Sequence, residues 1–191
     1  MPTLNFELLD QVSNLNCVKG INNKFILFNS SIVPRKNLHF LIQAFQSSGI
    51  AKKGFELCVA GKIHNDNYGE KIRKICDKDS TINLLGYVNE IEKSWLFLNA
   101  HAFASPSSVE GFGIPVLDAY ILGLDVLASN IPSHKEIAEI INLDGSLGKV
   151  KLLDLADIEG WVAALRDVAD RNSDISKIRR IDNYKFSLEN L

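Results

Sequence analysis

Apolar runs of strand length alternate with stretches of helical periodicity from about residue 24 onward. The runs Phe25–Phe28 and Leu57–Ala60 are apolar throughout, which is typical of strands buried on both faces of a sheet. Between them, apolar residues recur at i, i+3, i+4 and i+7 from Leu38 to Phe45, the spacing of one helix face. Further strands are expected at 82–85, 102–104, 125–128 and 150–153, and further helices at 68–76, after Asn89 through Leu98, from Ile114 to Gly123, at 132–140 and around 161–168.

This alternation predicts an α/β fold with a doubly wound, Rossmann-like parallel sheet in a single domain. Residues 1–23 lack the pattern and are interpreted as a lead-in or linker, and residues 24–191 as the domain. In such sheets the ligand crevice lies at the carboxyl ends of the strands, where the strand order changes direction. The loops that follow the strands are therefore expected to contain the functional residues.

Composition and charge narrow the function classes. The 191 residues are 46% apolar and 23% charged, with a formal net charge of −2. At roughly 150 residues per domain, this is one ordinary globular domain. A general nucleic-acid binder shows a basic balance, so no nucleic-acid partner is expected.

Cysteine usage and hydropathy indicate the compartment. The three cysteines, at positions 17, 58 and 76, are an odd number without Cys-x-x-Cys spacing, so neither a disulfide framework nor a structural zinc site is expected. No run approaches the ~20 apolar residues of a membrane span, and residues 1–11 lack a secretory signal pattern. A cytoplasmic protein is expected, and peripheral association with the inner face of a membrane stays open.

The segment Ser30–Asn37 is the first candidate for chemistry, because it connects the first strand to its helix. Arg35 and Lys36 fall at the start of that helix, and Asn37 is placed to cap it. The positive end of a helix dipole disfavours cations unless an anion accompanies them. A phosphate group is therefore a reasonable ligand for this segment. Two solvated surface cations are an equally simple interpretation.

The segment Glu110–Asp118 is the second candidate, and it also follows a strand and begins a helix. Gly111 and Gly113 let the backbone approach a ligand closely, and the free amides of Gly113 and Ile114 suit an anion. Glu110 and Asp118 are spaced to point into one crevice and to accept hydrogen bonds from hydroxyls. The plainer alternative is a tight turn with one capping carboxylate.

Several motifs occur together in a familiar order. They are Pro34–Asn37, Val59–Lys62, Gly86–Val88, Pro106-Ser107, Glu110–Ala119 and Gly123. Their order and spacing resemble the C-terminal, donor-binding half of retaining glycosyltransferases of the GT-B fold (glycosyl transferases group 1, family 4-like), a group that includes sucrose synthase and bacterial mannosyl- and glucosyltransferases. The resemblance covers about residues 24–141, and residues 110–119 resemble the Glu-x7-Glu motif of the family.

The resemblance implies a role for each matching residue in binding a nucleotide-diphosphate sugar. Lys36, with Arg35 beside it, binds the diphosphate, and Glu110 contacts the donor sugar near its reacting carbon; these two, Lys36 and Glu110, are the expected catalytic residues. The remaining donor-binding positions are Gly61 and Lys62 along the nucleotide crevice, Gly86, Tyr87 and Val88 beside the base, Gly111, Phe112, Gly113 and Ile114 at the sugar hydroxyls and phosphate, and Asp118 at the ribose.

Three departures from the family pattern stand out. Asp118 replaces the second glutamate and is one methylene shorter, so its ribose contact is expected to differ. Asn29 and Ser30 replace a Gly-Arg pair. Because that arginine is missing, Lys36 is expected to neutralise more of the phosphate charge. The chain also has no room for the N-terminal acceptor-binding domain of such enzymes, so we expect half of an enzyme, with weak or no transfer on its own.

The expected activity is hexosyl transfer with retention of configuration, in the synthesis of a bacterial surface polysaccharide. No cofactor or metal is expected, because cations and a helix dipole take the metal's role at the diphosphate. A non-catalytic nucleotide-binding or assembly module with the same fold is the alternative. A dinucleotide oxidoreductase is disfavoured, since Asn29–Pro34 does not contain Gly-x-Gly-x-x-Gly.

Geometry at the site follows from these assignments. Lys36 and the helix start at Gly113-Ile114 are expected to approach one common point, and Glu110 to lie beside it without a tight ion pair to Lys36. Ser133, His134 and Glu136, after the fifth strand, resemble a family loop at which helix capping is the simplest role.

Overall fold

The computed structural model describes residues 23–141, 149–171 and 180–182, and the isolated positions 4, 8, 9, 12, 18, 20 and 21. Six strands form one sheet: β1 (Lys24–Asn29), β2 (Phe55–Ala60), β3 (Ile82–Gly86), β4 (Ala102–Ser105), β5 (Asp125–Ser129) and β6 (Val150–Leu153). The helices between and after them are α2 (Leu38–Ser48), α3 (Asn67–Cys76), α4 (Glu90–Asn99), α5 (Ile114–Ile121), α6 (Pro132–Ile141) and α7 (Ile158–Asp170). Two short 3-10 helices, η1 (Pro34–Lys36) and η2 (Ile50–Lys53), complete the described part.

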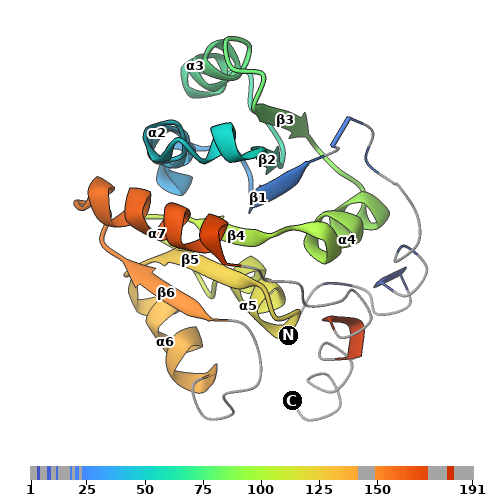
Figure 1. Cartoon of the computed structure of the whole chain (residues 1–191), viewed down its shortest axis with the longest axis vertical. Helices are drawn as coiled ribbons and strands as arrows, with labels where there is room; N and C mark the ends of the chain where they lie inside the picture. Colours follow the sequence, from blue (N-terminus) through green and yellow to red (C-terminus); the bar gives the residue numbers. More distant parts are fainter. Residues whose placement is uncertain are drawn as a thin grey trace.

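The sheet has the order β3-β2-β1-β4-β5-β6, and every adjacent pair is parallel (Figure 1). The predicted parallel sheet is therefore confirmed, with the carboxyl ends of all strands at one edge. Successive strands step outward on one side from β1 to β3 and on the other side from β4 to β6. The change of direction lies between β1 and β4, which is where a doubly wound sheet opens a crevice.

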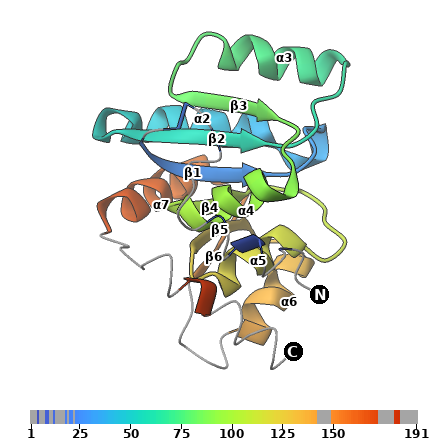
Figure 2. The same ribbon diagram turned by 90° about the vertical axis from the view of Figure 1, so that its right-hand side faces the viewer.

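Helices cover both faces of this sheet (Figures 1 and 2). One core cluster joins α2, α3 and α7 to side chains such as Ile26 and Phe28 of β1, and the other joins α4, α5 and α6 to Phe25 and Leu27 of the same strand. The alternation of neighbours on β1 explains the continuous apolar run, because both of its faces are buried.

Apolar residues before β1 belong to the second cluster. Leu4, Leu9, Val12 and Val18 are buried there, together with Ile181 near the other end of the chain. The boundary expected at residue 23 stays a prediction, but the described positions of the lead-in are packed on the domain.

The Cys58 side chain behaves as a small hydrophobe. Cys58 is fully buried in β2, and burial raises the pKa of its thiol to about 12. Cys76 is also buried and unpaired, and Cys17 lies outside the described residues. No helix in the described part of the chain is long and apolar enough to cross a membrane.

One local expectation was wrong. Arg35 and Lys36 lie in η1, before the first turn of α2, and the Asn37 side chain makes no capping hydrogen bond to that helix. Asn37 instead has a left-handed backbone, with φ of 50°, which asparagine tolerates better than most residues. This residue turns the chain from η1 into α2, so its backbone conformation, and not its side-chain oxygen, sets the junction.

Candidate functional site

The loops after β1 and β4 meet where the strand order reverses. The Ser108 amide and hydroxyl both donate to the Arg35 carbonyl, at 2.8 and 3.1 Å, and Arg35 Nη1 donates to the Val109 carbonyl at 3.1 Å. Because β1 and β4 are neighbours, residues more than 70 positions apart in the sequence are joined by these bonds. The first and second candidate segments thus form a single site.

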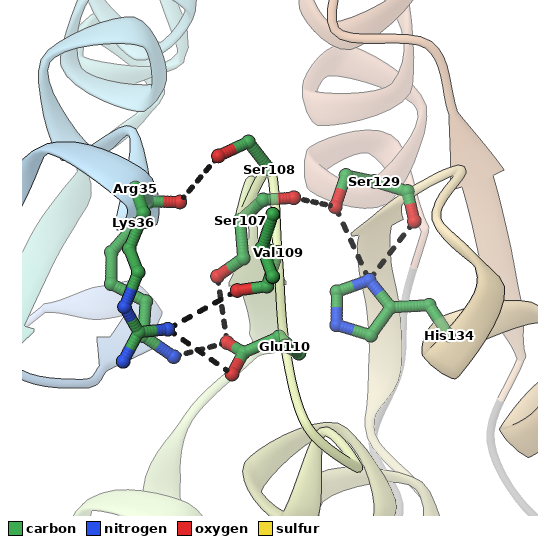
Figure 3. Close-up of polar contacts among 8 residues, drawn as sticks. All are labelled: Arg35, Lys36, Ser107, Ser108, Val109, Glu110, Ser129 and His134. Carbon is green, nitrogen blue, oxygen red and sulfur yellow. Dashed lines mark hydrogen bonds and ion pairs between the residues drawn. The ribbon is translucent and has the colours of Figure 1, made fainter.

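Lys36 and Glu110 form an ion pair at the centre of this site (Figure 3). Lys36 is 6% exposed and its ammonium donates to Glu110 Oε1, while Arg35 Nη1 lies 3.9 Å from Glu110 Oε2. The expectation that Glu110 would lie beside Lys36 without a tight pair was therefore wrong. A buried ammonium is costly without a counter-charge, and this carboxylate supplies it.

Two further hydrogen bonds hold Glu110. Ser107 Oγ donates to the same Oε1 at 2.7 Å. Burial opposes ionisation of Glu110, but the hydrogen bonds from Lys36 and Ser107 outweigh it, so the pKa of this carboxyl lies below its ordinary value. Glu110 is therefore an anion held at a fixed place, acceptor-only toward any further partner.

A polar chain continues from Ser107 to the loop after β5 (Figure 3). Ser129 Oγ donates to the Ser107 carbonyl, and His134 Nδ1 lies 2.9 Å from the Ser129 carbonyl. Burial lowers the pKa of His134, against the opposing effects of the Ser129 carbonyl and Glu110. His134 is fully buried, so its neutral form donates from Nδ1 to the carbonyl. Helix capping, the role expected from the sequence for this loop, stays a prediction; the hydrogen bonds of His134 and Ser129 connect the segments that follow β4 and β5.

The start of α5 lies against this histidine. Gly113 is the residue before the helix and has φ of +85°, and a Cβ there would meet His134 Cδ2 at 3.0 Å. Ile114 and Pro115 follow as the first helical residues, and Phe112 remains 40% exposed. The approach of Lys36 and the start of α5 to one common point stays a prediction.

The loops after β2 and β3 place the expected nucleotide-binding residues at the carboxyl edge of the sheet. Gly61 has φ of +145°, and a Cβ on it would lie 1.8 Å from the Ser30 carbonyl oxygen, so only glycine fits. Its amide donates to the Gly86 carbonyl at 2.7 Å. Lys62 is exposed, Tyr87 is 79% exposed, and Val88 packs partly on the core. These residues line the same edge as Lys36, as the parallel sheet requires.

Asp118 lies in the body of α5 and is 1% exposed. It is thus close in sequence to the site loop but enclosed by its surroundings. In the described ranges, no three His, Cys, Asp or Glu side chains gather as metal ligands would.

Comparisons with known proteins match most of the chain. The family model of "Glycosyl transferases group 1" matches residues 18–156. O-antigen chain mannosyltransferase B of Escherichia coli is 30% identical over 115 residues, which are 59% of this chain and 30% of that protein. An MMP alpha-(1->4)-mannosyltransferase of Mycolicibacterium hassiacum is 22% identical over 158 residues, 83% of this chain and 37% of that protein.

Solved structures share the fold. The HepE protein of Anabaena, in complex with UDP and glucose, superposes with a TM-score of 0.73 at 17% identity over 97% of this chain and 50% of that one. The catalytic domain of a cholesterol-alpha-glucosyltransferase of Helicobacter pylori gives a TM-score of 0.65 at 20% identity, covering 89% of this chain and 100% of that one. This chain spans well under half the length of the curated relatives described above.

Proposed function

Since the chain belongs to the glycosyl transferases group 1 family, we propose that it is the donor-binding half of a retaining glycosyltransferase. The substrate is a nucleotide-diphosphate sugar, and the full enzyme transfers the hexose to an acceptor held largely by a second, N-terminal domain. The single observation that carries the proposal is the meeting of two cations with a largely buried carboxylate at the point where the strand order reverses, in the loop that leads into α5.

Charge balance at this point suits a diphosphate. Lys36 and Arg35 carry two positive charges against one on Glu110, and the amides at the start of α5 add the positive end of a helix dipole. Negative charge that grows on the leaving diphosphate is stabilised by such fixed donors. Binding requires Lys36 to turn part of its hydrogen bonding from Glu110 to phosphate oxygens, with no metal ion in that role.

Other residues of the site bind the sugar, the base and the ribose of the donor. Glu110 accepts hydrogen bonds from hydroxyls of the sugar, because its carboxylate is ionised and already fixed by Ser107. Tyr87 offers an exposed ring to the base, beside Gly86 and Val88. Gly61 and Lys62 border the nucleotide, and Gly111 to Ile114 the sugar and phosphate. Asp118 is assigned to the ribose, and because it is 1% exposed, this contact requires the residues that cover it to move aside.

The names of the relatives guide the choice of sugar and pathway. Two relatives of this chain are called mannosyltransferases, one of them for an O-antigen chain, and a structural neighbour was solved with UDP and glucose. We therefore propose a hexose, with mannose tested first, and a place in the synthesis of a bacterial surface polysaccharide at the cytoplasmic side of the membrane.

Calorimetry on the 191-residue chain tests the donor site, with GDP-mannose, UDP-glucose, the two nucleoside diphosphates and pyrophosphate as ligands. Lys36→Ala is expected to weaken nucleoside-diphosphate binding by roughly 1.5–3 kcal/mol, the range for a hydrogen bond to a charged group. Lys36→Met keeps the buried stem and serves if the alanine variant does not fold. Lys151→Ala, an exposed lysine of β6, is the matched control and is expected to bind as wild type does.

A substitution at Asp118 tests the ribose contact independently of the phosphate contacts. Asp118→Asn is expected to weaken binding of nucleoside diphosphates and to leave pyrophosphate binding almost unchanged. Equal affinity of wild type and both Lys36 variants would remove Lys36 from the site. Donor binding with no transfer, after an N-terminal domain of a relative is supplied, would favour the non-catalytic module.

A further inference from the structure

A pocket lies beside the Glu110 loop, between that loop and the start of α6. It has a volume of about 410 Å³ and is enclosed by that loop, including Val109 and Glu110, and by the start of α6, including Ile131, Pro132, Ser133 and Glu136. Figure 3 shows Arg35 and Lys36 on one side of the segment 107–110, and Ser129 and His134 on the other. The pocket lies on the α6 side of this segment, opposite Arg35 and Lys36, and shares Glu110 and Gly111 with the proposed donor site.

Two buried polar atoms at the first turn of α6 have no hydrogen-bond partner among the described residues. They are Ser133 Oγ and His134 Nε2. Ser133 is 8% exposed and lines the pocket. An unsatisfied buried hydroxyl costs about 1–3 kcal/mol, so its place at the wall of a pocket points to a polar ligand. His134 donates through Nδ1 to the Ser129 carbonyl, which leaves Nε2 able only to accept.

The lining chemistry indicates a neutral, hydroxyl-bearing ligand. Glu136 contributes a carboxylate, whereas the Glu110 carboxylate is turned to Lys36 and Ser107 on the other side of the loop. No lysine or arginine is among the described residues that line the pocket, so nothing there favours a phosphate or carboxylate ligand. A carboxylate and a serine hydroxyl are good acceptors for hydroxyl groups. Val109, which is 63% exposed, and Pro132 add apolar surface for the C–H face of a sugar ring. The volume lies at the lower end of small-molecule sites, which suits one ring.

We propose that this pocket is a subsite for a hexose of the acceptor. The inference rests on the proposed transferase function and deepens it. Glu110 then stands between two sugars, the donor hexose on the Lys36 side and an acceptor hexose on the α6 side. Ser133 and Glu136 bind hydroxyls of the acceptor ring, and the domain contributes to acceptor recognition as well as to donor binding.

Amide NMR of the ¹⁵N-labelled 191-residue chain tests the subsite directly. Methyl α-mannopyranoside and methyl α-glucopyranoside are titrated into the millimolar range, where a single ring with few hydrogen bonds is expected to bind. We expect shifts of the amides of residues 108–111 and 133–136 that saturate for at least one sugar. Glu136→Gln and Ser133→Ala are each expected to weaken that binding at least about fivefold. Glu139→Gln, an exposed change of the same charge on the same helix, is the matched control and is expected to bind as wild type does.

A parallel titration with GDP and UDP keeps this inference separate from the proposed function. Nucleotide shifts around Lys36, Gly61 and Tyr87, with no saturable sugar shifts, would overturn the subsite and leave the donor site standing. Sugar shifts confined to the Lys36 side, or unchanged in both α6 variants, would also overturn it. Sugar shifts at the pocket without nucleotide binding would support a sugar subsite and count against the donor site.

Discussion

Gly113 shows how a single residue joins backbone conformation to packing at the site. Its φ is +85°, and a Cβ would meet His134 Cδ2 at 3.0 Å and Ile137 Cδ1 at 3.1 Å. An alanine there is strained in the backbone and crowded by a fully buried ring. Both effects act on the turn that begins α5.

Gly113→Ala is therefore expected to lower the free energy of unfolding by about 1–3 kcal/mol. Gly111→Ala is the matched control: nothing lies within 4 Å of its Cβ and its φ is not positive, so a change within about 0.5 kcal/mol is expected. Urea unfolding of the two variants checks the difference, and equal stabilities would contradict the described packing of Gly113 on His134.

His134 makes stability depend on pH. Burial holds its pKa below the ordinary 6.5 in the folded chain, so the folded state binds fewer protons than the unfolded state. The free energy of unfolding therefore falls as pH drops below 6.5, and this loss is complete once pH is below the folded pKa. Glu110, whose pKa is held below its ordinary 4.5, stays ionised between about pH 7 and pH 5.

His134→Asn is expected to reduce the fall in melting temperature between about pH 7 and pH 5, because asparagine keeps an N–H for the Ser129 carbonyl and does not titrate. His39 and His101, whose pKa values are also lowered by burial, preserve part of the slope. Melting curves across this range provide the measurement. A slope identical to that of wild type would show that His134 is not protonated on unfolding.

At the scale of the elements, local sequence signals set the starts of α3, α4 and α7. Asn89 accepts from the Glu92 amide at 2.9 Å and Glu92 accepts from the Asn89 amide at 2.9 Å, a complete capping box at the start of α4. The Asp66 and Asp157 side chains cap α3 and α7 in the simpler way. Each cap satisfies amides that the helix leaves unpaired.

Asn89→Ala is expected to cost about 0.5–2 kcal/mol of stability, since it removes one half of the box. Asn130→Ala, at an exposed position after β5, is the control and is expected to stay within about 0.5 kcal/mol of wild type. Chemical unfolding followed by circular dichroism distinguishes the two. A loss equal to that of the control would mean that water replaces the cap without cost.

At the scale of the whole molecule, one sheet separates two core clusters, and each contains one of the two tryptophans. Trp95 stacks on Phe25 in the cluster of α4 and α5, and Trp161 lies in the cluster of α2 and α7. Ile26 and Leu27, neighbours on β1, face opposite clusters. A substitution that destabilises one cluster is therefore expected to destabilise the other as well, because both clusters pack on β1. Cooperative unfolding is expected.

Ile26→Ala tests this cooperativity. Its cost is expected to be about 2–5 kcal/mol, seen equally by Trp95 in a Trp161→Phe background and by Trp161 in a Trp95→Phe background. Fluorescence-monitored urea unfolding compares each background with and without the change. A midpoint shift seen by Trp161 alone would show that the two faces unfold separately.

Much of this molecule follows from local patterns. Every strand and long helix expected from hydrophobic periodicity is present within a few residues. The reason is that a strand buried on both faces needs a continuous apolar run, and a helix buried along one side needs apolar residues at helical spacing. The parallel sheet followed from the alternation of those elements, and the family from motifs that lie in the loops after the strands. The two 3-10 helices and the left-handed Asn37 were not foreseen, since short turns carry little periodic signal.

Tertiary structure decided the electrostatics of the site. The ion pair of Lys36 with Glu110 joins residues 74 positions apart, and it depends on β1 and β4 being neighbours and on how deeply Lys36 is buried. Sequence motifs placed both residues at the sheet edge, but only packing removes water from them and so makes each the other's counter-charge. The same holds for Ser107, Ser129 and His134, whose hydrogen bonds connect two loops that no local pattern relates. A sequence encodes which residues reach an edge, whereas their pairing is settled by the burial that the whole fold imposes.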